Sequence, residues 1–221
     1  IICPMYVLDS GKVFNSAILI DRKGEILGVY KKIHPTIPEI EAGVVPGEKV
    51  EIFDTDIGPI SIAICFDLNF SDVFEPLENR IKVLFFPSAY PGGLQLVLRA
   101  FQGGFYAVSA IKYNTNGVIL DPLGRVLAES SSYNPVISAD VNLDYAILHI
   151  DYNHQKWRKI KEKYGQLIEL RVFRPEAIFM IVSNIKEKTV EDIMAEFDLE
   201  RLEKYFERSN KVRIGALSKM K

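Results

Sequence analysis

The chain has 221 residues, of which 48% are hydrophobic, and a formal net charge of -2 at pH 7. This length and composition fit one large domain, or a domain with an appendage, and leave ample material for a core. The small net charge gives no basic field for nucleic acid, and the longest apolar run, around Val83–Phe86, is too short to span a bilayer. Two cysteines without paired spacing, Cys3 and Cys65, predict a reducing, cytoplasmic setting.

The first half of the chain predicts mainly strands. Two apolar runs, 15–21 and 26–31, flank Arg22-Lys-Gly24 and predict a β-hairpin. A polar, proline-rich loop follows over residues 33–48. The next short strands are expected at 50–53, 60–65 and 83–86, and the last two are apolar enough to be buried on both faces.

Helices are expected between and after these strands. Residues 71–79 predict a short helix with Ser71 as N-cap, which Pro76 limits or kinks. Residues 94–101 predict a second helix that stops at Gly103-Gly104. Further strands are expected at 105–110, 117–120, 126–129 and 136–141.

The character of the sequence changes from Asp151. Residues 153–170 carry a charged helical pattern, and residues 187–208 predict one or two more helices. Asp198 is expected to cap a helix in which Leu199, Leu202 and Phe206 form one face. Strands and helices that alternate in this way indicate an α/β layered domain with a helical C-terminal extension.

Cys65 and Lys32 are the residues that suggest chemistry. Each stands at the end of a β-type run, and Cys65 precedes a polar turn. A thiolate attacks carbonyl carbon, and a lysine ammonium together with the backbone N–H of Phe66 can hold the resulting oxyanion. From these residues alone, Cys65 can equally be a buried strand residue and Lys31-Lys32 a solvated strand end.

The order of several motifs resembles the nitrilase, or carbon-nitrogen hydrolase, superfamily over about residues 15–175. The resemblance implies that Cys65 is the nucleophile and that Lys32, not Lys31, is the catalytic lysine. The motifs are Asn15-Ser-Ala-Ile-Leu-Ile-Asp21, Tyr30-Lys-Lys-Ile-His34, Pro46-Gly47, Phe53-Asp-Thr-Asp-Ile-Gly58, Ile64-Cys-Phe-Asp67, Phe86-Pro-Ser-Ala89, Asp121-Pro-Leu-Gly-Arg125 and Arg171-Val-Phe-Arg-Pro175.

The family often carries a second glutamate before Pro-Gly that positions the lysine. Glu39 and Glu41 both qualify, and the spacing Glu-x-x-x-Gly-x-x-Pro-Gly favours Glu39. Asp67 is expected to support the turn after Cys65. Contacts to the oxyanion or substrate are expected from Phe66, Asn69 and Tyr90.

The resemblance also implies a fold and a function. The expected fold is an α/β, nitrilase-like α-β-β-α sandwich that lacks its first strand-helix unit, with a hydrolase domain at 1–184 and a helical tail at 185–221. The expected reaction is hydrolysis of a non-peptide carbon-nitrogen bond through a cysteine thioester, without cofactor or metal. The expected substrate is a small amide, with nitriles and carbamoyl compounds left open, and the expected assembly is a homodimer or a higher homo-oligomer.

Departures from the family pattern support a second hypothesis. The family's general-base glutamate lies well before the lysine, and this sequence starts too late to carry it, so weak activity is expected. Gln102 and Gly103 replace a Glu and an Asn, Ile111 replaces an Asn, and the following loop is shortened to 112–116. The alternative is therefore a catalytically inert nitrilase-fold subunit that serves binding or assembly. His34 is expected to be structural, and His149 and His154 lack a third partner for a metal site.

Overall fold

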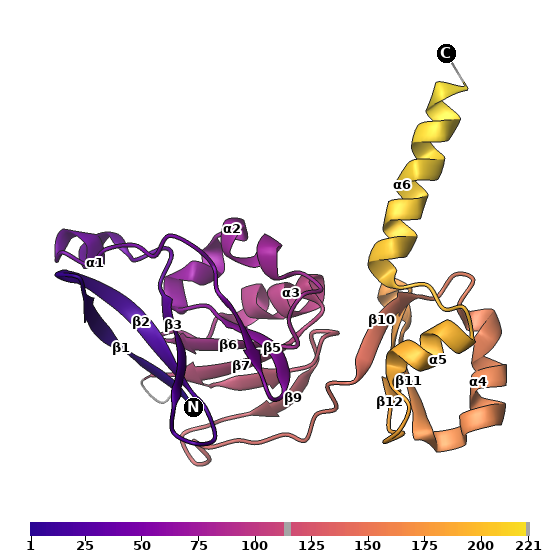
Figure 1. Ribbon diagram of the computed structural model, residues 1–221, viewed down its shortest axis with the longest axis horizontal. Helices are drawn as coiled ribbons and strands as arrows, with labels where there is room; N and C mark the ends of the chain where they lie inside the picture. Colours follow the sequence, from indigo (N-terminus) through magenta and orange to yellow (C-terminus); the bar gives the residue numbers. More distant parts are fainter. Residues whose placement is uncertain (113–115, 220–221) are drawn as a thin grey trace. The chain divides into compact units, whose positions relative to one another are not determined.

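The computed structural model describes residues 1–112 and 116–219. The chain divides into two compact units, Ile1–Ala139 and Asp140–Lys221 (Figure 1). The predicted limit of the hydrolase domain at residue 184 stays a prediction. Within the described part of the chain, no helix has the length and apolar character needed to cross a membrane.

The first unit contains a three-stranded antiparallel sheet in the order β1-β2-β3. Its strands are β1 (Ile2–Asp9), β2 (Lys12–Ile20) and β3 (Ile26–Lys31). The pairing of β2 with β3 confirms the predicted hairpin. The strand β1 was not predicted from the sequence. It is connected to β2 by Ser10 and Gly11, whose φ angles of 51° and 76° suit a tight hairpin turn.

A six-stranded sheet forms the centre of the first unit, in the order β4-β5-β6-β7-β8-β9. The pairs β5–β6 and β6–β7 are parallel, and the other neighbours are antiparallel. The strands are β4 (Ile52–Thr55), β5 (Gly58–Ile62), β6 (Val83–Ser88), β7 (Tyr106–Ile111), β8 (Val118–Leu120) and β9 (Val126–Glu129). The six strands predicted between residues 50 and 129 are thereby confirmed to within a few residues at each end.

Helices cover one face of this six-stranded sheet, and the three-stranded sheet meets its other face. The helices α2 (Ser71–Phe74) and α3 (Gly93–Gly103) contribute to one buried apolar cluster with residues of β6 and β7 (Figure 1). A smaller cluster joins Ala17 and Tyr30 of the three-stranded sheet to Ile62 and Ile64, with Cys65 packed at its border. The first unit is therefore layered as helix, sheet and sheet, and Cys65 lies where the two sheets meet.

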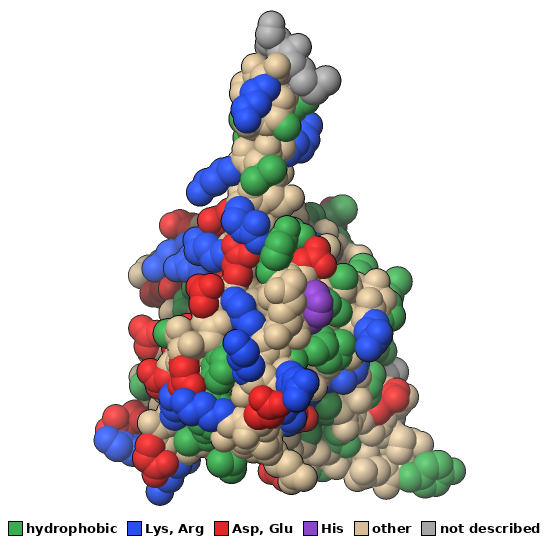
Figure 2. Space-filling view, turned by 90° about the vertical axis from the view of Figure 1, so that its right-hand side faces the viewer, with side chains coloured by type: hydrophobic (Ala, Val, Ile, Leu, Met, Phe, Trp, Pro, Cys, Tyr) green, Lys and Arg blue, Asp and Glu red, His purple; other side chains and the backbone are tan. Residues whose placement is uncertain are grey.

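The second unit is built on a three-stranded antiparallel sheet in the order β10-β12-β11. Its strands are β10 (Tyr145–His149), β11 (Ile168–Phe173) and β12 (Ile178–Ser183), and its helices are α4 (Trp157–Tyr164), α5 (Val190–Glu196) and α6 (Leu202–Ser218). Figure 2 shows Lys and Arg side chains interspersed with Asp and Glu over the face that carries α6. Ion pairs such as Lys163–Glu196 and Arg208–Glu200 account for part of this mixture.

One predicted element is wrong and another is too long, and each difference has a physical reason. Residues 136–141 form no strand, because an alternating pattern needs a partner strand, and Val136 is 81% exposed here. The helix predicted over 153–170 is confirmed for residues 154–164, where a 3-10 turn leads into α4, but it is too long, since Gly165 takes a positive φ of 56° and ends α4. The chain then forms β11.

Two predicted helix caps are also wrong. Phe70 is the N-cap of α2, so Ser71 is already its first helical residue, and α2 ends at Phe74, two residues before Pro76. Arg201 is the N-cap of α6, whereas Asp198 has a φ of 50° in the loop before it. Leu199 consequently packs into the core of the second unit from outside the helix. The predicted stop of α3 is confirmed, because Gly104 caps it in the left-handed conformation.

Candidate active site

Cys65 lies on a sharp turn that follows the buried strand β5. Its φ angle is 51°, a left-handed value that is uncommon for a residue with a side chain. A 3-10 helix, Cys65–Asn69, begins at this residue. A strained backbone between a strand and a helix can hold a side chain clear of the sheet, as the nucleophile elbows of α/β-hydrolases do.

Tyr90 and Asn69 hold this turn from the side. The Tyr90 hydroxyl donates a hydrogen bond of 3.0 Å to the carbonyl oxygen of Cys65. Asn69 Nδ2 donates to the Tyr90 hydroxyl at 3.3 Å and to the carbonyl oxygen of Phe66 at 3.0 Å. Burial raises the pKa of Tyr90, against the effect of the Asn69 hydrogen bond. The three residues expected to contact substrate thus gather around Cys65.

Lys32 follows β3 directly and is only 2% exposed. Its backbone N–H donates to the Asn15 carbonyl at 2.8 Å, and its carbonyl accepts from Gly47 N–H at 2.8 Å. A Cβ atom added to Gly47 would overlap the Lys31 carbonyl, so this close approach requires glycine. Lys31 points away from Lys32, as strand alternation dictates, and pairs with Asp9 at 2.7 Å.

Glu39 is the carboxylate that the structure places on Lys32. Its Oε2 accepts from Lys32 Nζ at 2.7 Å and from the backbone N–H and the hydroxyl of Thr36, and its Oε1 accepts from Asn15 Nδ2 at 2.5 Å. Burial raises the pKa of the Glu39 carboxyl, but the hydrogen bonds from Lys32, Asn15 and Thr36 outweigh it and lower the pKa to about 2. Glu41, the alternative, is exposed. Glu39 is therefore an anion at neutral pH that fixes the ammonium group.

Asp67 is fully buried directly behind the cysteine turn. Its carboxylate accepts hydrogen bonds from the Tyr30 hydroxyl at 2.9 Å, from His34 N–H at 2.8 Å and from Ile64 N–H at 2.9 Å. Burial raises the pKa of Asp67, while these bonds and the positive charge of Lys32 oppose the rise. All of these contacts are structural, in line with the expected support of the turn.

Sequence reasoning did not single out Asn15, Thr36 or Tyr30. One signal was available for Thr36, because Thr36-Ile-Pro-Glu39 has the spacing of a capping box at the start of α1 (Ile37–Glu41). That motif would have selected Glu39 over Glu41 without any family resemblance. Asn15 and Tyr30 reach their partners from 24 and 37 residues away, and no local pattern indicates such contacts.

The histidine rings lie outside this arrangement, although the backbone N–H of His34 takes part in it. The His34 ring stacks on Phe70 at 3.8 Å and contacts Asp72 at 3.0 Å, which fits a structural role. His149 stacks on Tyr205 in the second unit, where His154 bonds to the Ile150 carbonyl. Over residues 1–112 and 116–219, no group of three or more His, Cys, Asp or Glu side chains could hold a metal ion.

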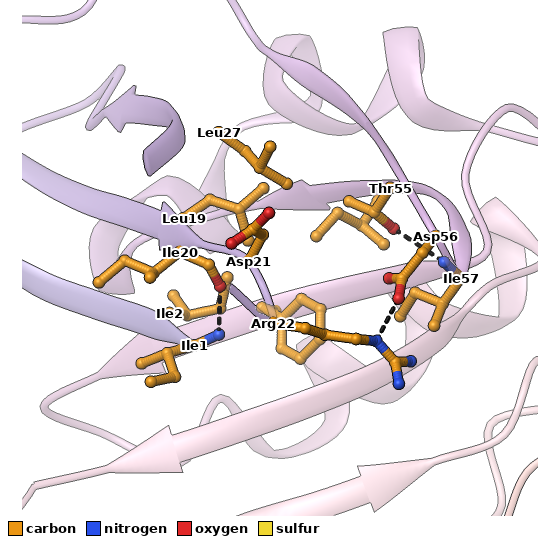
Figure 3. A pocket seen from close by; sticks show the side chains of 12 residues that line it. Ile1, Ile2, Leu19, Ile20, Asp21, Arg22, Leu27, Thr55, Asp56 and Ile57 are labelled. Atoms are coloured by element: carbon orange, nitrogen blue, oxygen red, sulfur yellow. Dashed lines mark hydrogen bonds and ion pairs between the residues drawn. The ribbon is translucent and has the colours of Figure 1, made fainter. Parts of the chain in front are cut away.

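A pocket of about 510 Å³ lies between the turn joining β2 to β3 and the turn joining β4 to β5 (Figure 3). Its lining is mostly apolar, with Leu19 and Leu27 on one side, and an ion pair between Arg22 and Asp56 spans it. Cys65, Lys32 and Glu39 are not among the residues that line it. These three residues therefore lie apart from this pocket.

The chain matches a known protein family and several curated proteins. The model of the carbon-nitrogen hydrolase family matches residues 1–149. The omega-amidase NIT2 of Xenopus tropicalis is 25% identical over an alignment of 175 positions that covers 65% of this chain and 63% of that protein. The deaminated glutathione amidase of Dictyostelium discoideum is 25% identical over an alignment of 180 positions that covers 67% of this chain and 62% of that protein. The chain thus spans a little over three-fifths of the length of these curated relatives.

Two solved structures share the fold. Nit3 of Saccharomyces cerevisiae, a member of branch 10 of the nitrilase superfamily, has a TM-score of 0.52 and 22% identity, covering 58% of this chain and 54% of Nit3. An amidase from Nesterenkonia sp. has a TM-score of 0.53 and 23% identity, covering 59% of this chain and 56% of the amidase. These neighbours confirm the expected nitrilase-like fold. With the family model matched over residues 1–149, the chain belongs to the carbon-nitrogen hydrolase family.

Proposed function

We propose that this site cleaves the carbon-nitrogen bond of small amides through a thioester on Cys65. The observation that supports this most is the pair of the buried Lys32 and the partly buried Glu39, whose segment is tied by Asp67 to the left-handed turn that carries Cys65. A buried ammonium held by an ionised carboxylate is a fixed positive charge. Such a charge stabilises an oxyanion far better than a mobile, solvated lysine.

The proposed chemistry has two stages. The Cys65 thiolate attacks the amide carbonyl, Lys32 and the Phe66 N–H hold the oxyanion, and the carbon-nitrogen bond breaks as the amine or ammonia leaves with a proton. Water then hydrolyses the thioester, which releases a carboxylic acid and restores the thiol. Amides are favoured over nitriles and carbamoyl compounds because several relatives are amidases.

Both stages need a proton acceptor, and Glu39 is unsuited to that task. A carboxylate with a pKa of about 2 that accepts four hydrogen bonds has little tendency to take up a proton at neutral pH. We therefore assign Glu39 to positioning Lys32 and not to general-base catalysis.

This same observation favours the second candidate, an inert nitrilase-fold subunit for binding or assembly. The family pattern has Asn at the position of Gly103. An Asn would not fit there unless Phe105 moved, because an added Cβ would overlap the Phe105 ring. The shortened loop falls partly at 113–115, outside the described residues. The proposal also includes a homodimer or higher homo-oligomer and a cytoplasmic location, which suits two free cysteines.

Ammonia release from a panel of short aliphatic amides tests the proposed function. The chain is expected to release ammonia at least about 10²-fold more slowly than an ordinary amidase, since Glu39 is held as an anion and general-base assistance contributes about 10²–10⁴-fold. The residual release should disappear in Cys65→Ala and persist in Cys3→Ala. Fast turnover would contradict the assignment of Glu39 to positioning alone, and release unaffected by Cys65→Ala would refute the proposed nucleophile.

A further inference from the structure

We infer that Asp67 is a positioning residue that locks the lysine segment and the cysteine turn into one arrangement. The inference rests on the proposed function of Cys65 and Lys32. It goes beyond local support of the turn, because it assigns to one buried carboxylate the geometry between the nucleophile and the group that stabilises the oxyanion.

The contacts of Asp67 come from both sides of the site. Tyr30 and His34, two residues before and two residues after Lys32, donate to its carboxylate at 2.9 and 2.8 Å. Ile64, the residue before Cys65, donates at 2.9 Å. The residues on both sides of Lys32 and the residue just before Cys65 therefore all bond to the carboxylate of Asp67.

The turn itself is closed on the same residue. Asp67 N–H donates to the Ile64 carbonyl at 3.1 Å, and the Asp67 carbonyl accepts from Phe70 N–H at 3.1 Å. The backbone and the side chain of Asp67 therefore both constrain the left-handed conformation of Cys65. A shift of the carboxylate would move the thiol and the ammonium relative to each other.

A carboxylate suits this position better than an amide. Three donors converge on the carboxylate, and an ionised Asp is acceptor-only, whereas an Asn amide would turn an NH₂ group toward one of those donors. Asp67 is fully buried, so water cannot take over a lost contact without entering the core. An Asn at this position should loosen the link between the two segments.

Two reactions of the same thiol separate positioning from simple folding. Alkylation by iodoacetamide requires only the Cys65 thiolate, whereas acylation by p-nitrophenyl acetate also requires an oxyanion to be stabilised. The ratio of the acylation rate to the alkylation rate, measured on the Cys65 peptide by mass mapping, cancels any change in the thiolate fraction. A residue that merely stabilises the fold leaves this ratio unchanged in the folded protein.

Asp67→Asn is expected to lower this ratio about tenfold, since small misplacements of reacting groups have effects of this size or larger. Tyr30→Phe, which removes one of the three bonds and adds no donor, should lower it about threefold and covers the case in which Asp67→Asn does not fold. The matched control is Asp121→Asn. Asp121 is equally buried and accepts from Leu123 N–H, Arg125 N–H and Arg125 Nε, but in a turn with no part in the proposed site.

An unchanged ratio in both Asp67→Asn and Tyr30→Phe would overturn the inference while leaving the proposed function intact. An equal fall in Asp121→Asn would overturn it too, since the effect would then follow from any buried turn carboxylate. If the unaltered chain is not acylated on Cys65 at all, the proposed function fails first, and the role of Asp67 fails with it.

Discussion

Replacing Lys32 with methionine is expected to slow acylation of Cys65 by p-nitrophenyl acetate about 10²–10³-fold, the effect of removing one oxyanion donor from a hydrolase. Methionine keeps the length and apolar stem of the side chain at a position that is 2% exposed, but it removes the charge. The burst of p-nitrophenol in single-turnover experiments gives the rate. Iodoacetamide alkylation of the same variant shows whether the thiol itself is still accessible.

Lys31→Met is the matched control, because it removes the same charge from the neighbouring position. Lys31 pairs with Asp9, and exposed pairs of this kind contribute about 0–1 kcal/mol. Because so little energy is lost with this pair, the acylation rate of Lys31→Met should stay within about threefold of the rate of the unaltered chain. Equal losses in the two variants would mean that Lys32 has no special part in the reaction.

Glu39→Ala should destabilise the first unit strongly, whereas Glu41→Ala should not. Removing Glu39 leaves the Lys32 ammonium buried without its anion, and breaking a buried ion pair in this way costs about 3–5 kcal/mol. Glu41 is exposed, so its loss should change the free energy of unfolding by less than about 0.5 kcal/mol. Urea unfolding midpoints measure both. Similar midpoints for the two variants would contradict the buried pair.

The same carboxylate predicts how stability depends on pH. The pKa of Glu39 falls from 4.5 to about 2 on folding, so the unfolded chain binds more protons between these values. Its contribution is complete above pH 4.5 and is lost as the pH falls toward 2. Glu39→Gln should flatten this part of the profile of unfolding midpoint against pH, and an unchanged slope would show that Glu39 is not held as an anion.

Local sequence patterns predict most strands of the first unit well, because alternating or fully apolar runs meet partner strands there. The same reasoning fails at residues 136–141, where the pattern is present but no partner strand is. It also fails after Gly165, where one backbone angle ends the charged helical pattern of α4 and β11 begins. The errors therefore lie where tertiary pairing or a single turn decides the outcome.

The candidate site shows a similar division. Cys65, Lys32 and Glu39 can be selected from motif order and spacing, and the structure places Glu39 on Lys32. The left-handed backbone of Cys65 and the convergence of Tyr30, His34 and Ile64 on Asp67 depend on how the two sheets meet. Contacts that span more than 30 residues leave no local trace in the sequence.

The central claim is that Cys65 is the nucleophile of an amide-cleaving site, and peptide mapping after reaction with p-nitrophenyl acetate tests it most directly. We expect one acetyl group per chain, on the peptide that contains Cys65, with the Cys3 peptide unmodified and no thioester formed in Cys65→Ala. Equal acetylation of Cys3 and Cys65, or no acetylation of either, would contradict the claim.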